Sequence, residues 1–501
     1  MKKKKTAIQP TRKENYPEWY QQVIKAADLA EQAPVRGCMV IKPWGYALWE
    51  NIQRLLDARF KATGHKNAYF PLFIPLSYLE REAEHVEGFA KECAVVTHHR
   101  LVKDEEGKLT PASPLEEPLV VRPTSEMMIG EMFAKWIDSY RQLPLLLNQW
   151  ANIVRWEMRP RLFLRTTEFL WQEGHTAHAS EKEARAKAKQ MLDLYVDFVE
   201  NTLAIPVIPG EKSASERFPG AVATFTLEAM MQDGKALQAG TSHFLGQNFA
   251  RAANITFADP AGKQAHVWMT SWGVTTRLIG GLIMTHGDDD GVILPPRIAA
   301  AQVVIIPLMH REERQEELST YCRTLKEKLE GLSYCGKPLT VELDDSDQRS
   351  GEKIWGWIKK GVPIRIEVGL RELDAKKVSV TKRTAGHKEA CLQSEEELLA
   401  TLTAQLEKIQ SELFARAKKR RDDRLTVVDT QEAFYELFSK DNKEQGFALA
   451  HWNGKGEVEE RIKRDLGVTL RCIPFEARPE KGRCPFSGEE SPQRVVFAKA
   501  Y

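Results

Sequence analysis

The stretch of sequence that decides the fold is a pair of short segments joined by a loop, Asn152-Ile-Val-Arg-Trp-Glu157 and Leu164-Arg-Thr-Thr-Glu-Phe-Leu-Trp-Gln-Glu-Gly-His175. We interpret them as one strand and the strand that returns beside it. Alternate side chains of a strand lie on the same face, so Arg155 and Glu157 share a face. Such a face can bind a phosphate and an amine edge together, although a salt bridge between the two side chains is the commoner outcome.

The returning segment carries an aromatic ring, a carboxylate and an imidazole at alternate positions, Trp171, Glu173 and His175. Alternation places these three groups on one face of the strand. This combination suits a small polar ligand better than a protein core.

A third segment, Val121-Arg-Pro-Thr-Ser-Glu126, places a hydroxyl and a carboxylate two residues apart in a turn after a strand. Thr124 and Glu126 could receive an ammonium group there. The alternative is a helix cap, because Thr124 or Ser125 followed by an acidic residue is typical of a helix N-terminus. Taken alone, the residues favour the cap.

Two more segments complete the set, Leu237-Gln-Ala-Gly-Thr-Ser-His-Phe-Leu-Gly-Gln-Asn-Phe249 and Ser271-Trp-Gly-Val-Thr-Thr-Arg277. The small residues of the first permit close backbone approach, while a lone histidine in such a segment is more often structural. The second is typical of a strand that runs into a helix. Arg277 at that junction can meet a triphosphate, and a surface arginine is the alternative.

Composition excludes several classes of protein. The chain has 501 residues, 72 basic and 70 acidic, with 28% charged and 42% apolar residues, as in soluble globular proteins of about three domains. The net charge of +2 gives no global attraction for nucleic acid, so any such contact must be a local patch. The sequence contains no apolar run of 18 residues, and its basic start lacks a following apolar region, so we expect neither a membrane span nor a secretory signal. Seven cysteines without a Cys-x-x-Cys pair favour a reduced, cytoplasmic chain.

The pattern of apolar residues divides the chain near residue 300. Before it we expect helices over 15–32, 44–60 and 181–200, strand-like pieces over 35–41 and 68–75, and a surface loop or hairpin over 100–118. After it, strands over 301–307, 339–343 and 362–368 alternate with helices over 311–330 and 351–360, which indicates a compact α/β domain. A charged helix over 395–424 then leads to a small last unit, 425–501.

Taken in order, these segments resemble the signatures of prolyl-tRNA synthetases of the archaeal/eukaryotic-like type, a family of class II aminoacyl-tRNA synthetases. The resemblance covers nearly the whole chain, because residues 44–75 look like class II motif 1 and Gly361-Val-Pro-Ile-Arg-Ile-Glu-Val-Gly369 also fits. It implies an α+β fold, in which an antiparallel-sheet catalytic core flanked by helices (1–300) precedes an α/β anticodon-binding domain (301–400) and a small C-terminal α+β domain (401–501).

The resemblance implies ATP-dependent ligation of L-proline to tRNA(Pro) through prolyl-adenylate, with Mg²⁺ accompanying ATP. Arg155 and Arg277 would be the catalytic arginines. The implied proline-binding residues are Phe89, Glu92, Thr124, Glu126, Arg155, Trp171, Glu173, His175, Phe218, His243 and Ser271. The implied ATP-binding residues are Arg155, Glu157, Arg165, Thr166, Phe169, Gln238, Thr241, Thr275 and Arg277. Contacts to the anticodon would come from Glu342, Lys353, Glu367 and Arg371, each of which could instead be a solvated charge.

Two departures from the pattern of relatives carry predictions. Only 122 positions separate Arg155 from Arg277, so we expect no editing domain between them. Many relatives hold zinc with four cysteines in the C-terminal unit, whereas here only Cys484 stands at such a position. Tetrahedral zinc needs four good ligands, so we predict no metal site, with packing by Phe475, Phe486, Val495 and Phe497 in its place.

Two rival hypotheses remain open from the sequence. One is another class II synthetase, because the threonine and histidine enzymes share the general plan. The other is a non-catalytic tRNA-binding or regulatory paralogue. Such a protein should have lost the motif arginines, whereas Arg155, Glu157 and Arg277 are all present here. The motif 1 region with Pro71 also implies a homodimer, as in class II relatives.

Overall fold

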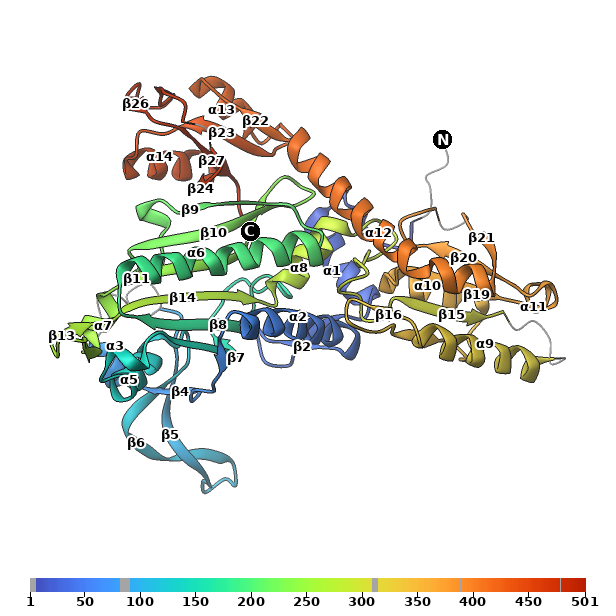
Figure 1. Cartoon of the computed structure of the whole chain (residues 1–501), viewed down its shortest axis with the longest axis horizontal. Coiled ribbons are helices and arrows are strands. Elements are labelled where there is room, and N and C mark those ends of the chain that lie inside the picture. Colours follow the sequence, from blue (N-terminus) through green and yellow to red (C-terminus); the bar gives the residue numbers. More distant parts are fainter. Residues whose placement is uncertain (1–5, 82–90, 309–313, 387–388, 478) are drawn as a thin grey trace.

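The computed structural model describes residues 6–81, 91–308, 314–386, 389–477 and 479–501. It has a large central part, a smaller α/β part at one end and a C-terminal unit beside the central sheet (Figure 1). In these described ranges, no helix combines the length and the apolar character needed to cross a membrane.

Seven strands of the central part form one sheet, in the spatial order β9-β10-β11-β14-β8-β7-β3. They are β3 (Lys66–Asn67), β7 (Leu145–Val154), β8 (Glu168–His178), β9 (Val207–Glu211), β10 (Ala223–Met230), β11 (Ala236–Gly246) and β14 (Trp268–Thr275). All neighbours pair antiparallel except β3 and β7, which are parallel. The predicted antiparallel core is confirmed.

Helices cover this sheet with their apolar faces. The long ones are α1 (Tyr16–Ala26), α2 (Pro43–Ala62), α6 (Glu181–Asp197) and α8 (Arg277–His286), and a π-helical turn (Phe198–Thr202) continues α6. Helix α6 begins where the Ser180 side chain accepts the Glu183 backbone N–H, and it packs Ala184, Ala188 and Tyr195 against the sheet. The expected helix over 15–32 is too long, because Asp28 adopts a left-handed backbone conformation (φ 57°) and the chain then pairs β1 (Ala30–Gln32) with β2 (Met39–Ile41).

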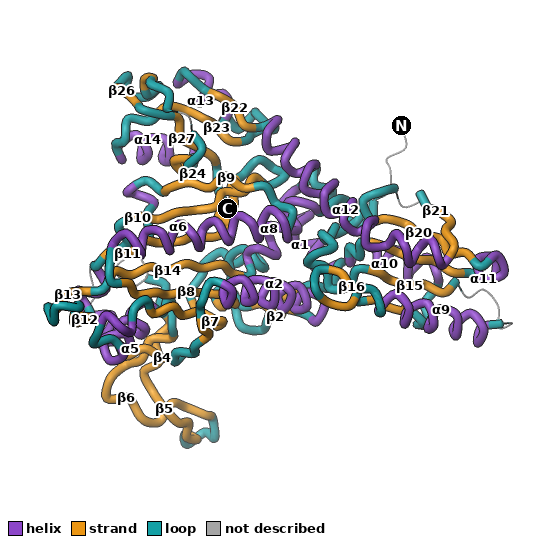
Figure 2. Tube along the Cα trace, in the orientation of Figure 1, coloured by secondary structure: helices purple, strands orange, loops and turns teal. Residues whose placement is uncertain are grey.

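A hairpin projects from the central part (Figure 2). It consists of β5 (Ala94–Lys103) and β6 (Leu109–Val121), and β4 (Phe73–Pro75) pairs with β6 at its base. Of the two alternatives for residues 100–118, the structure therefore has the hairpin. Smaller elements beside it are α3 (Leu76–Arg81), α5 (Glu126–Trp136), the short turn Tyr140–Gln142, α7 (Asn248–Ala252), β12 (Thr256–Ala258) and β13 (Gln264–His266).

The second part is the predicted α/β domain. Its sheet, in the order β18-β15-β19-β20-β21, contains β15 (Val303–Pro307), β18 (Val341–Leu343), β19 (Ile364–Val368), β20 (Lys377–Lys382) and β21 (Cys391–Ser394). Its other elements are α9 (Gln315–Glu330), β16 (Ser333–Tyr334), β17 (Lys337–Pro338), α10 (Ser350–Lys360), α11 (Leu370–Ala375) and α12 (Glu395–Asp423). The apolar stripe of α12, which includes Leu398, Leu402 and Leu406, packs into the core of this sheet. Helix α12 then runs on towards the C-terminal unit (Figure 1).

The C-terminal unit does not stand apart as expected, because it extends the central sheet. Its elements are β22 (Leu425–Val427), α13 (Gln431–Leu437), β23 (Phe447–His451), α14 (Gly456–Leu466), β24 (Thr469–Pro474), β25 (Gly482–Arg483), β26 (Glu490–Ser491) and β27 (Arg494–Ala498). Strand β24 pairs with β9, Ile473 opposite Glu211, so the strands β22, β23, β24 and β27 join the seven central strands in one sheet of 11 strands among the described residues. Gly210 permits this approach, since a Cβ atom there would lie 2.5 Å from the Ile473 carbonyl oxygen.

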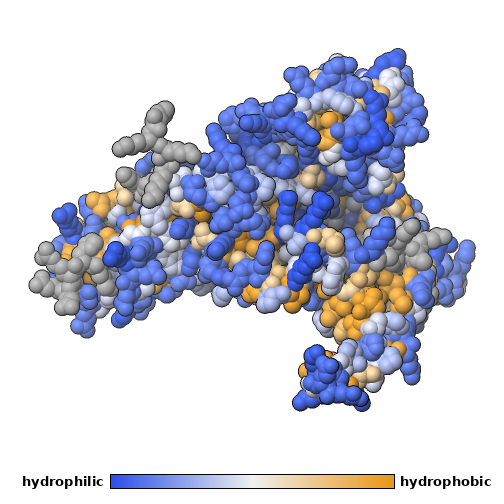
Figure 3. Space-filling view, turned by 180° about the vertical axis from the view of Figure 1, so that it is seen from behind, coloured by the Kyte–Doolittle hydropathy of each residue, from blue (hydrophilic) through white to orange (hydrophobic). Residues whose placement is uncertain are grey.

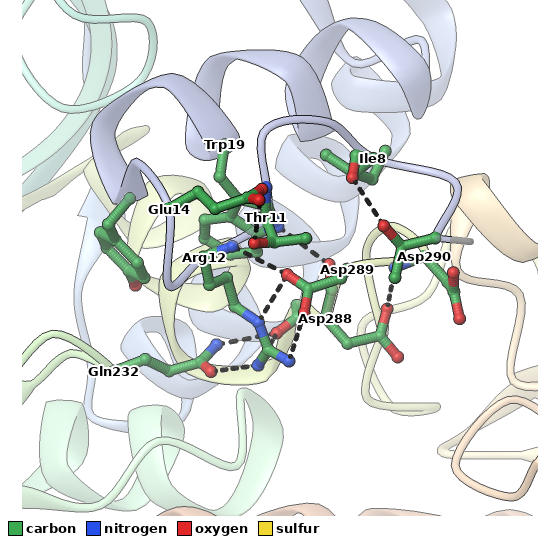
Figure 4. A network of polar contacts seen from close by, with 12 residues as sticks. Ile8, Thr11, Arg12, Glu14, Trp19, Gln232, Asp288, Asp289 and Asp290 are labelled. Carbon is green, nitrogen blue, oxygen red and sulfur yellow. Dashed lines mark hydrogen bonds and ion pairs between the residues drawn. The ribbon is translucent and has the colours of Figure 1, made fainter. Parts of the chain in front are cut away.

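The N-terminal segment is fixed at the far end of α8 (Figure 4). Arg12 donates to both carboxylate oxygens of Asp289 and, at 2.6 Å, to the Gln232 side-chain oxygen. The preceding residue, Asp288, accepts from the Arg383 guanidinium of the second part at 2.8 and 2.6 Å. The helix that begins at Arg277 is therefore held at its other end by contacts to two remote segments.

Candidate active site

A cavity of about 510 Å³ opens on one face of the central sheet, and the sequence segments singled out above converge on it. The predicted residues that line it are Glu92, Thr124, Glu126, Arg155, Glu157, Arg165, Thr166, Phe169, Trp171, Glu173, His175, Phe218, Gln238, Thr241, His243, Ser271, Thr275 and Arg277. Phe89 lies outside the described residues.

The register of three neighbouring strands explains this convergence. On β8 and β14, His175 lies opposite Ser271, and Trp171 lies opposite Thr275. On β11, His243 lies opposite the same Ser271. Since residues opposite each other point to the same face and alternate along each strand, the alternating polar residues of three separate segments form one floor.

One end of the cavity is acidic and hydrogen-bonded. The Thr124 hydroxyl donates to the Glu126 carboxylate, and the Ser125 hydroxyl donates to Glu173. Ser125 makes no side-chain cap at the start of α5, so the capping alternative for this segment is not realised. Glu173 also accepts from Gln149 Nε2 at 2.6 Å, which leaves it fixed and fully buried.

The imidazole beside Glu173 carries a polar atom without a partner. His175 Nε2 lies 2.9 Å from Glu173 Oε2, while buried His175 Nδ1 has no hydrogen-bond partner among the described residues. Burial disfavours the imidazolium, but the hydrogen bond and charge of Glu173 outweigh it and raise the pKa of His175. Among the same residues, Ser271 Oγ and Trp171 Nε1 also lack partners. Buried polar atoms usually have partners, so these three atoms indicate a place for a polar ligand.

His243 and Phe218 close this end of the cavity. Their rings lie 4.6 Å apart at 31°. The Thr224 hydroxyl lies 3.0 Å from His243 Nδ1 and accepts the Phe218 backbone N–H at 3.0 Å, so one residue holds both rings. Burial lowers the pKa of His243 to about 4, which keeps it neutral at physiological pH.

The other end of the cavity gathers arginines. Arg155 donates from Nε to the Pro123 carbonyl at 3.0 Å, and its guanidinium lies 5.9 Å from the ring centroids of both Phe169 and Trp171. Arg277, the first residue of α8, donates from Nε to the Leu164 carbonyl at 3.3 Å.

Arg277 lies buried among other cations. Burial, together with the charges of Arg165 and Arg155, lowers the pKa of Arg277 to about 10. Crowded buried cations are unfavourable unless an anion joins them. The arginine end of the cavity is therefore suited to a polyanion.

The carboxylate near these arginines is also held in place. Glu157 Oε1 accepts the Arg159 backbone N–H at 2.7 Å, and the Glu157 backbone N–H contacts the Thr167 hydroxyl at 3.4 Å. Strand β7 ends at Val154, so Arg155 and Glu157 do not lie on a strand as expected but directly after it, and both line the cavity.

Sequence reasoning missed one wall of the cavity, the segment between β9 and β10. Lys212, Glu216, Arg217 and Pro219 line the cavity beside Phe218. One signal could have found this wall: Glu228 is a carboxylate within an otherwise apolar and hydroxyl-bearing strand, Ala-Thr-Phe-Thr-Leu-Glu-Ala-Met. A buried carboxylate needs cationic partners, and Lys212 is one, with Nζ 2.8 Å from Glu228 Oε1.

The residues proposed for the anticodon lie in the α/β part. Glu342 and Glu367 lie opposite Val304 and Ile306 of β15, so they share one face of that sheet. Lys353 is buried in α10 and donates to the Asp344 carbonyl at 3.0 Å, and Glu367 accepts from Arg365 at 2.7 Å. Arg371 is exposed near the start of α11.

The C-terminal unit has an apolar centre where many relatives were expected to hold zinc. Buried Cys484 lies in a cluster with Phe486, Val495 and Phe497, while Cys472 belongs to a different cluster. Phe475 does not join that core and packs against Phe225 instead, at 5.5 Å between ring centroids. Within the described ranges, no three His, Cys, Asp or Glu residues stand together as metal ligands. The residues present do not fit a tetrahedral zinc site.

Comparison with known families agrees with this geometry. The model for the class II core domain of tRNA synthetases (G, H, P, S and T) matches residues 108–286, and the model for the anticodon binding domain matches residues 302–405. The fold and the cavity thus define a class II aminoacyl-tRNA synthetase.

Further matches specify the family. The model for the prolyl-tRNA synthetase C-terminal domain matches residues 435–501. The chain is 59% identical over 505 residues to proline–tRNA ligase 2 of Anaeromyxobacter dehalogenans (strain 2CP-C), covering 99% of each chain. It is 56% identical over 505 residues to proline–tRNA ligase of Protochlamydia amoebophila (strain UWE25), covering 100% of this chain and 99% of that relative. The chain belongs to the prolyl-tRNA synthetase family.

Proposed function

We propose that this chain ligates L-proline to tRNA(Pro) at the expense of ATP, and that the cavity on the central sheet is where both steps occur. The observation that carries the proposal is the division of one cavity into an acidic, hydrogen-bonded end and an arginine end. An amino acid activated by ATP presents a cationic amine on one side and a polyphosphate on the other, and this division matches both.

At the acidic end, Thr124 and Glu126 hold the imino group of proline in a charge-assisted contact, and the Thr124 hydroxyl also donates to the Glu126 carboxylate. The ring of proline lies among side chains that are already fixed by their neighbours. These are Glu92, Trp171, Glu173, His175, Phe218, His243 and Ser271. We include Phe89 in the proposal from its place in the sequence alone.

At the arginine end, Arg155 bridges the proline carboxylate and the α-phosphate, while Arg277 and Thr275 hold the γ-phosphate side. Glu157 accepts from the adenine amine and Phe169 stacks on its ring. The remaining nucleotide contacts come from Arg165, Thr166, Gln238 and Thr241. Mg²⁺ arrives with ATP as part of the substrate and neutralises the triphosphate.

The chemistry needs positioning and charge more than proton transfer. The proline carboxylate attacks the α-phosphorus in line, a carboxyl oxygen–phosphorus bond forms, and pyrophosphate leaves. A carboxylate is already a nucleophile, so this step needs no general base. Buried arginines that face the developing negative charge lower the barrier of adenylate formation. In the second step a ribose hydroxyl of the tRNA terminal adenosine attacks the prolyl carbonyl and an ester bond forms. The bond between the carbonyl carbon and the phosphate oxygen breaks, AMP leaves, and the hydroxyl proton is released with it.

We propose the organisation 1–300 catalytic, 301–400 anticodon-binding and 401–501 C-terminal, with anticodon contacts from Glu342, Lys353, Glu367 and Arg371. The proposed anticodon contacts are supported by the common side of the α/β sheet on which Glu342, Lys353 and Glu367 lie. The archaeal/eukaryotic-like subtype is a further proposal. Its support is that the residues between Arg155 and Arg277 form strands of the central sheet, the helices α6 and α7, the small β12-β13 sheet and their connections.

We also propose a cytoplasmic homodimer without structural zinc. Cys322, Cys472 and Cys484 are buried thiols that form no disulfide among the described residues, which suits a reducing compartment. An apolar patch lies where the projecting hairpin joins the body (Figure 3). Tyr69, Phe73 and Val95, exposed by 74%, 46% and 51%, belong to this region beside Pro71. Such exposure on a monomer favours a protein interface, and sedimentation of the purified chain tests it.

Exchange of labelled pyrophosphate into ATP, surveyed across amino acids, tests the function. We expect exchange that depends on proline, with weaker exchange for alanine, because a small apolar difference is worth only about 1–3 kcal/mol. The threonine and histidine alternatives predict exchange with those amino acids, and a non-catalytic paralogue predicts none. Adenylate formation that survives unchanged in Arg155→Ala would contradict the mechanism.

A further inference from the structure

The wall that sequence reasoning missed, residues 212–222, depends for its position on the C-terminal unit. It joins β9 to β10 and contains only the single 3-10 turn Ala214–Glu216 as regular structure. Five of its residues line the cavity, namely Lys212, Glu216, Arg217, Phe218 and Pro219. A segment with so little internal structure takes its shape from its neighbours.

One carboxylate of the C-terminal unit holds this wall directly. Glu459 of α14 is only 7% exposed, and its Oε2 atom accepts from the Ser213 hydroxyl at 2.7 Å and from the Ser215 hydroxyl at 2.6 Å. Lys463, one turn further along α14, lies 3.7 Å from Glu216. The loop therefore meets the helix through charge-assisted hydrogen bonds, which are stronger than neutral ones.

A second contact set lies directly beneath the wall. Glu228 of β10 binds Lys212 through Oε1 at 2.8 Å and Arg471 of β24 through Oε2 at 3.0 Å. All three side chains are nearly inaccessible, with 0% exposure for Glu228. Since Arg471 belongs to the C-terminal unit, this triad joins the unit to the cavity wall through the core.

The backbone fixes the same junction. Pro474 of β24 lies opposite Gly210 of β9, and the Phe475 N–H donates to the Pro209 carbonyl at 3.2 Å. The wall therefore begins directly after a strand pair that the C-terminal unit completes.

We propose that the C-terminal unit sets the proline end of the cavity and that Glu459 is a positioning residue for proline. By holding Ser213 and Ser215, Glu459 fixes the segment that delivers Phe218 against His243. Glu459 itself is not among the residues that line the cavity. The assignment of the proline end rests on the proposed function.

The test compares Glu459→Ala with wild type in pyrophosphate exchange by the full chain. We expect the KM for proline to rise about tenfold, because two charge-assisted hydrogen bonds are lost and 1.4 kcal/mol corresponds to tenfold. The KM for ATP should change less than twofold, because the two serines that Glu459 holds lead directly to Phe218, which packs on His243 at the proline end. Glu460→Ala, at the exposed neighbouring position of α14, is the matched control and should match wild type.

A double-mutant cycle separates positioning from general destabilisation. Ser213→Ala with Ser215→Ala should raise the KM for proline by a similar factor, and Glu459→Ala added to this variant should raise it little further. The serine variant alone tests the proposal if Glu459→Ala fails to fold. An unchanged KM for proline, an equal rise in the KM for ATP, or effects that simply multiply would each overturn the proposal. If the wild type lacked proline-dependent exchange, the proposed function would fail instead.

Discussion

The buried triad of Lys212, Glu228 and Arg471 makes a sharp prediction about stability. Glu228→Gln keeps the shape of the side chain but removes its charge, which leaves two buried cations facing a neutral amide. Breaking a buried ion pair by removing one partner costs about 3–5 kcal/mol. We expect a loss of this size in the unfolding free energy of the transition that includes the central sheet, measured in urea at pH 7.

The pH dependence of that loss follows from the pKa of Glu228. Burial alone would raise this pKa, but Arg471 and Lys212 outweigh it and lower the pKa below its ordinary value of 4.5. The stabilisation is therefore complete above pH 4.5 and is lost as the pH falls through the lowered pKa. The difference between wild type and Glu228→Gln should shrink in acid, since both side chains are then neutral.

Two control variants test whether the loss of stability comes from the unpaired buried cations. Glu490→Gln, at an exposed position of the C-terminal unit, should leave the unfolding free energy unchanged. Replacing the whole triad, with Lys212→Met and Arg471→Met added to Glu228→Gln, should recover much of the loss, because apolar residues of similar volume need no counter-charge. Unfolding free energies for Glu228→Gln and wild type that agree within about 0.5 kcal/mol at pH 7 would refute the account.

Three further predictions follow from the cavity and the sheet junction. Arg277→Ala should lower the rate of pyrophosphate exchange about 10²–10³-fold while the KM for proline stays near wild type, and an unaltered rate would contradict the role of this arginine. Gly210→Ala should cost about 1–3 kcal/mol in chemical unfolding, because the added methyl group meets Ile473, whereas Gly456→Ala, with open space around it, should be tolerated. His175→Gln should remove stability that is complete below pH 6.5 and fades as the pH rises through the raised pKa, so a wild-type advantage that grows with pH would contradict the Glu173 pairing.

Much of the site was predictable from the sequence because strands alternate. Trp171, Glu173 and His175 share a face of β8, and the structure places all three at the cavity. Arg155 and Glu157 also line the cavity, although β7 ends at Val154 and both residues follow the strand. Element ends were less predictable. The apolar spacing after Tyr16 continues to Leu29, but the helix ends at Ala26, since Asp28 turns left-handed and the following residues pair as strands.

Distant residues decided which hydrogen bonds the Thr124-Ser125-Glu126 segment makes. Its sequence fits a helix cap, yet Ser125 bonds Glu173, which is 48 residues away along the chain. A local pattern cannot reveal such a partner, because the competing hydrogen bond forms only when β8 lies beside the turn.

The amino-acid sequence by itself determined the elements and the chemistry along each strand, because side-chain alternation and apolar periodicity are local properties. Only the tertiary structure decided that β24 would extend the central sheet beyond β9, and that Arg471 would meet Glu228 across 243 residues. A buried charge needs a counter-charge and a strand edge needs a pairing strand, and no local pattern specifies which distant segment supplies them.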